Sequence, residues 1–224
     1  MRVLLLVLLV GCVDPVAARW QLDHDHVVAV RATPPGIMPG EVAVLDALVA
    51  REGTLAAIES PVLAAAPLAP PEMTGMLVEA DGHWQITAPP DETLAGVRPG
   101  MGLDPGAPVP VDVVMQFTHS NGEPMYVKKT VWLGARAENP SPPAVLADDE
   151  PMPSELAIPI GRDVYVEALA AGRISWLTSC GELFQDDVAR AFVRAAEPCE
   201  GELAVVMRDP TGGVVWQTWP IRAQ

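Results

Sequence analysis

The chain has 224 residues, enough for about two domains of 100–150 residues each. Half of the residues are hydrophobic and 19% are charged, which excludes an intrinsically disordered chain. The 29 acidic and 14 basic residues give a net charge of −15, and so acidic a surface repels polyphosphate and excludes nucleic-acid binding. The 24 prolines and 18 glycines exceed their usual share of about 12% and favour short strands joined by turns.

The N-terminal residues carry the pattern of an export signal. Met1-Arg2 is a short positive region, and Val3–Val10 is an apolar run too short to span a bilayer as a helix. The run ends in LVGC (residues 9–12), which resembles the lipobox of bacterial lipoproteins. That resemblance implies cleavage before Cys12, a diacylglycerol on its thiol, a fatty acyl chain such as palmitate on its amino group, and no other cofactor. The alternative is an ordinary signal with a chance cysteine.

Two or more acyl chains anchor a protein stably in a membrane. Cys12 is followed by Val13 and not by the aspartate that commonly retains lipoproteins in the inner membrane, although Asp14 comes one position later. We therefore expect a lipid-anchored protein of the cell envelope, in the outer membrane in preference to the inner membrane.

The first half of the mature chain is predicted to contain strands. The Ala- and Pro-rich stretch 54–80 has no clean period and could hold a short helix, an irregular strand or a long loop, and residues 89–110 are predicted to be a loop. Lys129 falls on the apolar face of its strand unless a bulge reverses the register. The predicted strands are His26–Ala32, Glu41–Ala50, His83–Ala88, Val111–Thr118 and Tyr126–Ala137.

A proline-rich segment, Asn139–Pro143, predicts an extended, semi-rigid linker that holds the second half away from the first. Six short strands then follow at spacings of about 8–12 residues, which fits a β-sandwich. These strands are Leu156–Ile160, Asp163–Leu169, Arg173–Ser179, Ala189–Ala195, Glu202–Asp209 and Val214–Ile221.

Cys180 and Cys199 remain as a pair once Cys12 carries lipid. In an oxidising compartment a disulfide is the expected state of such a pair. A metal pair or two free thiols are the alternatives, and no further His or Cys lies nearby in the sequence to complete a zinc site.

Trp176 and the segment LAVVMRDPTGGVVW (residues 203–216) resemble an immunoglobulin-like sandwich of the PKD, cadherin and bacterial Ig-like group. In that arrangement the strand before Cys180 runs antiparallel beside the strand after Cys199, which places the two cysteines close together. The first half, with VVAVRATPPGIMPGEVAVLDALVA (residues 27–50) and ENPSPP (residues 138–143), resembles uncharacterised exported lipoproteins of myxobacteria-like Gram-negative bacteria.

These resemblances imply an all-β protein with two immunoglobulin-like β-sandwich domains in tandem after a lipoprotein signal peptide, and they bring no catalytic residue. The expected organisation is a signal peptide (1–11), a lipid-attached tether (12–24), a first sandwich (25–138), a Pro-rich linker (139–153) and a second sandwich (154–224).

Few residues suggest chemistry. His24 and His26 share a face of an extended chain and are weak candidates for Zn²⁺ or Cu²⁺, and the acidic run Asp148, Asp149 and Glu150 is a weak candidate for Ca²⁺ between domains. His119 and Ser120 lie at a predicted hairpin tip without identifiable catalytic partners, and hydrolase motifs such as Gly-x-Ser-x-Gly are absent. The tryptophans could stack on sugars or pack in cores: Trp20, Trp84, Trp132, Trp176, Trp216 and Trp219.

The sequence therefore favours a membrane-anchored, non-enzymatic binding or scaffold module whose partner is an envelope protein with a basic or apolar contact face. A lipoprotein that binds calcium, another metal or a glycan is the first alternative, and a cell-envelope hydrolase is the second.

Overall fold

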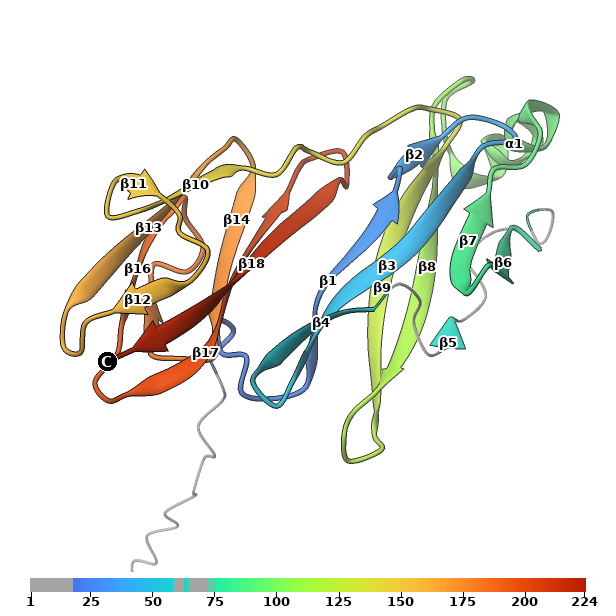
Figure 1. The fold of residues 1–224 in the computed structure, drawn as a ribbon. Helices are drawn as coiled ribbons and strands as arrows, with labels where there is room; N and C mark the ends of the chain where they lie inside the picture. Colours follow the sequence, from blue (N-terminus) through green and yellow to red (C-terminus); the bar gives the residue numbers. More distant parts are fainter. Residues whose placement is uncertain (1–17, 59–62, 65–72, 74) are drawn as a thin grey trace, which may run out of the picture.

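The strand-rich sequence folds into two β-sandwiches that lie side by side (Figure 1). The computed structural model describes residues 18–58, 63–64, 73 and 75–224; the signal peptide and Cys12 lie outside this range. Within the described residues no helix has the length and apolar character needed to cross a membrane.

The first sandwich consists of two sheets. One has the order β1-β3-β7-β6, with β4 beside the second half of β3. Its strands are β1 (His26–Thr33), β3 (Val42–Arg51), β4 (Thr54–Ile58), β6 (Leu77–Ala80) and β7 (His83–Thr87). The other sheet has the order β2-β9-β8-β5. Its strands are β2 (Gly36–Ile37), β5 (Leu63–Ala64), β8 (Val109–Thr118) and β9 (Pro124–Leu133).

The second sandwich also has two sheets. One has the order β11-β10-β13-β16-β15, and its strands are β10 (Ala144–Ala147), β11 (Glu150–Pro151), β13 (Asp163–Leu169), β15 (Glu182–Phe184) and β16 (Arg190–Arg194). The other has the order β12-β18-β17-β14, and its strands are β12 (Leu156–Ile158), β14 (Arg173–Thr178), β17 (Cys199–Arg208) and β18 (Val214–Ala223).

The two sandwiches share one topology. In each sandwich the first strand pairs antiparallel within one sheet, β1 with β3 in the first sandwich and β10 with β13 in the second. The chain then crosses to the other sheet. There β2 runs parallel to the last strand, β9, and β12 runs parallel to β18. This switch of the first strand between two antiparallel sheets is typical of immunoglobulin domains. The protein is all-β, with two immunoglobulin-like β-sandwiches in tandem.

The alternating pattern explains the strands that the sequence predicts best. Along β8, buried and half-buried residues alternate over all ten positions, so every second side chain enters the core of the first sandwich. Such a pattern fixes the register, because a shift of one residue would expose the whole apolar set.

The structure differs from the predicted loop at residues 89–110. A short helix, α1 (Asp91–Val97), and a 3-10 turn, η2 (Pro99–Met101), lie in this stretch. Pro90 precedes the helix, two acidic residues stand in its first turn, and Leu94 and Val97 bury one face. The helix has seven residues and only two buried positions, so its apolar pattern is too short to be recognised in a sequence rich in proline and glycine.

The expected linker at residues 139–153 also differs from the structure. Strands β10 and β11 lie inside this range and pair with the second sandwich, so the connection without strands is limited to Asn139–Pro143 near its start. In the stretch 54–80, where the sequence left a short helix, an irregular strand or a long loop open, the short strands β4, β5 and β6 occupy parts of the described residues.

Candidate functional site at the domain junction

The two sandwiches pack face to face through one sheet of each. The outer faces of β1 and β3 meet the outer faces of β14, β17 and β18 in a buried apolar layer that is separate from both sandwich cores. Its buried members are Leu22, Val28, Ala29, Leu48, Ala50, Leu177, Ala204, Val206 and Val214. The prolines of Asn139–Pro143 therefore do not hold the domains apart, because apolar outer faces gain free energy by covering each other.

Polar contacts join the two domains at the rim of this layer. Asn139 donates from Nδ2 to the Ala32 carbonyl at 2.8 Å and accepts the Val214 backbone N–H at 2.9 Å, so one side chain joins both domains. The Arg31 guanidinium lies 4.2 Å from the centre of the Trp216 ring, again across the junction.

Lys129 forms another bridge. The register of β9 is regular and places Lys129 opposite Val113, on the apolar face as the sequence predicted. Lys129 is 7% exposed, and its ammonium group donates to the Gly212 carbonyl in the β17–β18 hairpin of the other domain. Burial lowers the pKa of Lys129 to about 8, although the Asp209 charge acts in the opposite direction.

The N-terminal segment joins the junction as well. Gln21 forms a parallel bridge with Thr178 at the end of β14, the Leu22 N–H donates to the Thr178 carbonyl, and the Thr178 N–H donates to the Trp20 carbonyl. Leu22 is fully buried in the apolar layer. The described part of the expected tether is thus an ordered strip against the second sandwich.

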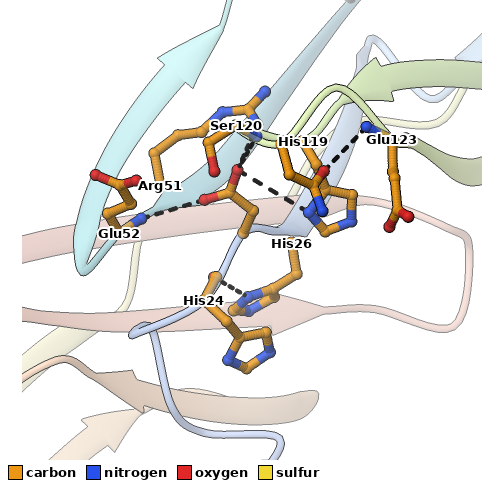
Figure 2. Close-up of polar contacts among 9 residues, drawn as sticks. His24, His26, Arg51, Glu52, His119, Ser120 and Glu123 are labelled. Atoms are coloured by element: carbon orange, nitrogen blue, oxygen red, sulfur yellow. Dashed lines mark hydrogen bonds and ion pairs between the residues drawn. The ribbon is translucent and has the colours of Figure 1, made fainter.

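The carboxylate of Asp25 connects three segments, and its partners Ser120, Arg51 and Glu52 are labelled in Figure 2. It accepts the backbone N–H of Ser120 at 2.5 Å, the Arg51 guanidinium at 3.0 Å and the backbone N–H of Glu52 at 3.3 Å. Burial alone would raise the pKa of Asp25, but hydrogen bonds from Ser120, Arg51 and Glu52 outweigh it and lower the pKa to about 2. This group of contacts could not be predicted from the sequence, because the partners of Asp25 are 26, 27 and 95 residues away.

The same cluster brings His119 and Ser120, both labelled in Figure 2, toward Asp25. The His119 Nδ1 atom is 4.0 Å from the Asp25 carboxylate, too far for a hydrogen bond. Ser120 contacts Asp25 through its backbone N–H. A carboxylate with a pKa of about 2 and three donors stays ionised and has no proton to exchange near neutral pH. The arrangement holds the β8–β9 hairpin and the β3–β4 turn to the N-terminal segment.

The two histidines do lie together, as their spacing predicted. Their rings stack with centroids 4.6 Å apart, His24 contacts Asp23, and the Nδ1 atom of His26 contacts the His24 carbonyl. Burial lowers the pKa of His26. Across residues 18–58, 63–64, 73 and 75–224, no three His, Cys, Asp or Glu side chains are gathered as a metal ion would require.

The acidic run expected near a domain boundary lies elsewhere. Asp148 and Asp149 both have positive φ, 47° and 69°, and form the tight turn between β10 and β11. The Asp148 carboxylate accepts the Tyr165 backbone N–H, and Asp149 pairs with Arg190 at 3.2 Å. Glu150 begins β11. This turn is on the side of the second sandwich that faces away from the first (Figure 1).

The predicted disulfide is confirmed. Cys180 and Cys199 are bonded, with their Cα atoms 5.6 Å apart. Strand β14, before Cys180, runs antiparallel beside β17, which begins at Cys199, so the bond closes one end of a single sheet.

The tryptophans mainly fill cores. Trp176 is fully buried, Trp20 and Trp219 pack against the same core, Trp84 packs against the first core, and Trp216 lies in the junction.

Comparison with known proteins finds solved structures of low identity and low TM-score. No protein-family model matches the chain, and no curated protein matches it. Among solved structures, the N-terminal Ig1-2 module of the Drosophila receptor protein tyrosine phosphatase DLAR is 12% identical, with a TM-score of 0.30, 90% of this chain covered and 99% of that chain. Murine CEACAM1b is 9% identical, with a TM-score of 0.28 and coverage of 88% and 100%. The fibronectin(III)-like modules of Clostridium thermocellum CbhA are 11% identical, with a TM-score of 0.30 and coverage of 89% and 94%.

Proposed function

We propose that this chain is a lipid-anchored, non-enzymatic binding module of the cell envelope that presents a sheet face to a protein partner. The observation that carries the proposal is a row of three aromatic rings, one exposed and two half-buried, on the sheet of the second sandwich that lies outside the apolar layer between the domains. This aromatic row consists of Tyr165 on β13, Phe192 on β16 and Phe184 on β15.

The row has the composition of a protein contact site. The Phe184 and Phe192 rings stack at 4.6 Å, and the Tyr165 ring lies 5.8 Å from Phe192 with 42% of the residue exposed. The Arg190 and Arg194 guanidinium groups lie 5.1 and 5.9 Å from the centres of the Tyr165 and Phe184 rings. Exposed tyrosine and arginine side chains carry much of the binding energy in protein interfaces.

The anchor rests on the LVGC sequence at residues 9–12. The chain from Cys12 to Ala18, where the ordered strip begins, is only long enough to span about 20 Å. A lipid on Cys12 would therefore hold the packed pair of sandwiches close to the bilayer. The strip meets the end of β14, so the end of the second sandwich that carries Cys180 would be the nearer one.

Anchoring is tested on the full chain expressed in a Gram-negative host. We expect the intact mass to lack residues 1–11 and to include acyl chains, and we expect Cys12→Ala to release the protein from membranes. A mature chain that begins beyond residue 12 without lipid would overturn the anchor.

Partner binding is tested by cross-linking in the native envelope and quantifying the captured proteins. Tyr165→Ser with Phe192→Ser should remove a partner that the unaltered chain captures. Tyr126→Ser is the matched control, because Tyr126 is 65% exposed on β9 of the other domain. Capture that survives the double substitution would refute the aromatic row as the contact site. Reproducible hydrolysis that one substitution abolishes, with no partner found, would refute the binding function.

A further inference from the structure

A cavity of about 370 Å³ opens where the edge strands of the two sandwiches meet. Its walls come from the start of β1, from β14, from the end of β17, from the segment between β15 and β16 and from the N-terminal strip. The charged residues that line it are Arg19, Arg173, Arg208, Asp186 and Asp187. This volume falls in the range of small-molecule binding sites.

Two of these arginines stand side by side. Arg173 on β14 is directly opposite Arg208 on β17 in the antiparallel ladder, so both side chains project from the same face of the sheet. Like charges at directly opposite positions destabilise a sheet. Burial and the Arg173 charge both lower the pKa of Arg208.

The protein does not neutralise this pair. Arg208 donates to the Val28 carbonyl at 2.9 Å and lies 3.4 Å from the Ser175 hydroxyl, and both of those groups are uncharged. Within the described part of the chain, no carboxylate lies within 4 Å of a nitrogen of Arg173 or Arg208.

The nearby acids are already occupied. Arg19 pairs with Asp186 at 2.9 Å and with Asp187 at 3.0 Å. Most other arginines in the described residues also have a carboxylate partner, as expected in a chain with 29 acidic residues. Two adjacent, unneutralised guanidinium groups beside a cavity are therefore unusual for this molecule.

We infer that the cavity binds an oxyanion, the carboxylate or phosphate group of a small ligand, held by the paired guanidinium groups of Arg173 and Arg208. Arginine presents several N–H donors in a planar fork that suits both groups, and the bound charge removes the repulsion between the two side chains. The Ser175 hydroxyl and the Arg19 guanidinium border the same space. This inference does not depend on the lipid anchor or on the aromatic row.

The test is calorimetric titration of the full chain, in detergent at low ionic strength, with inorganic phosphate, citrate, glucuronate and uncharged glucose. We expect heat of binding with one or more of the anions and none with glucose. Comparing the affinity for phosphate with the affinities for citrate and glucuronate identifies which oxyanion the site prefers. Added salt should weaken the binding, because the arginines are partly exposed.

Arg173→Gln is the decisive variant, because Arg173 is exposed and makes no hydrogen bond through its side chain in the described structure. It should weaken anion binding at least tenfold while leaving stability without ligand unchanged or raised. Arg208→Gln should weaken binding similarly. Arg162→Gln is the matched control, since Arg162 is also exposed, has no carboxylate within 4 Å among the described residues and lies outside the cavity. Absence of binding by all three anions, binding that persists in Arg173→Gln, or an equal loss in Arg162→Gln would overturn the inference.

Discussion

The carboxylate of Asp25 should be one of the most sensitive positions in the molecule. The Asp25 side chain is 4% exposed and accepts hydrogen bonds from Ser120, Arg51 and Glu52, which belong to two other segments. Removing one partner of a buried ionic contact costs about 3–5 kcal/mol. We expect Asp25→Ala to lower the free energy of unfolding by about that amount. Asp25→Asn, which keeps an acceptor oxygen but loses the charge, should cost about half as much.

The pH dependence of the free energy of unfolding separates the effect of the Asp25 charge from the effect of its shape. The pKa of Asp25 falls from 3.8 to about 2 on folding, so its charge stabilises the fold fully above about pH 4, and this contribution is lost as the pH falls through about 2. The shift corresponds to roughly 2 kcal/mol. Urea unfolding from pH 7 to pH 2 should show the difference between the unaltered chain and Asp25→Asn shrinking over this range.

Asp23→Ala is the control for this series, because Asp23 is exposed and its carboxylate hydrogen-bonds, among the described residues, with the neighbouring His24 alone. It should change stability by less than about 0.5 kcal/mol. If Asp25→Asn cost the same at pH 2 as at pH 7, or if Asp25→Ala cost less than about 1 kcal/mol, the assignment of Asp25 as an ionic tie between segments would be wrong.

Three further predictions concern the junction and the disulfide. The pKa of Lys129 falls from 10.5 to about 8 on folding, so the free energy of unfolding should rise with pH between these values. In urea unfolding, Lys129→Met should lose that rise, whereas Lys128→Met, at an exposed position, should keep it. Leu48→Asp places a charge in the apolar layer and should split one calorimetric unfolding transition into two. Val42→Asp should not, because Val42 is 40% exposed on the same face of the strand. A single transition in both variants would refute coupling of the two domains through this layer. Reducing the Cys180–Cys199 bond should lower the stability of the second sandwich by about 3 kcal/mol in urea unfolding, and no change would contradict a stabilising role.

Strands with a clear period were predictable and loops between them were not. The prediction for Asp163–Leu169 matches β13 at both ends, and the predicted Val111–Thr118 lies within β8, because each alternates strictly between core and surface. Strand β10 was missed because its four residues follow directly after the prolines that predict a linker. The Asp25 cluster was beyond sequence reasoning for another reason. Its donors come from distant turns, and two of the three are backbone N–H groups, which leave no mark on residue type.

The packing of the two domains is visible in the sequence as continuous apolar runs, which a search for alternating apolar and polar residues overlooks. A strand with one face in a core and one in solvent should alternate, but β17 is buried at five successive positions from Leu203 to Met207, and β3 is buried continuously from Ala47 to Ala50. Continuous apolar runs indicate strands that are covered on both faces. Neither run can be covered twice within its own two-layer sandwich, so each requires a third layer. The two strands supply that layer to each other's sheets, which is why a proline-rich connection leads to a packed pair and not to an extended one.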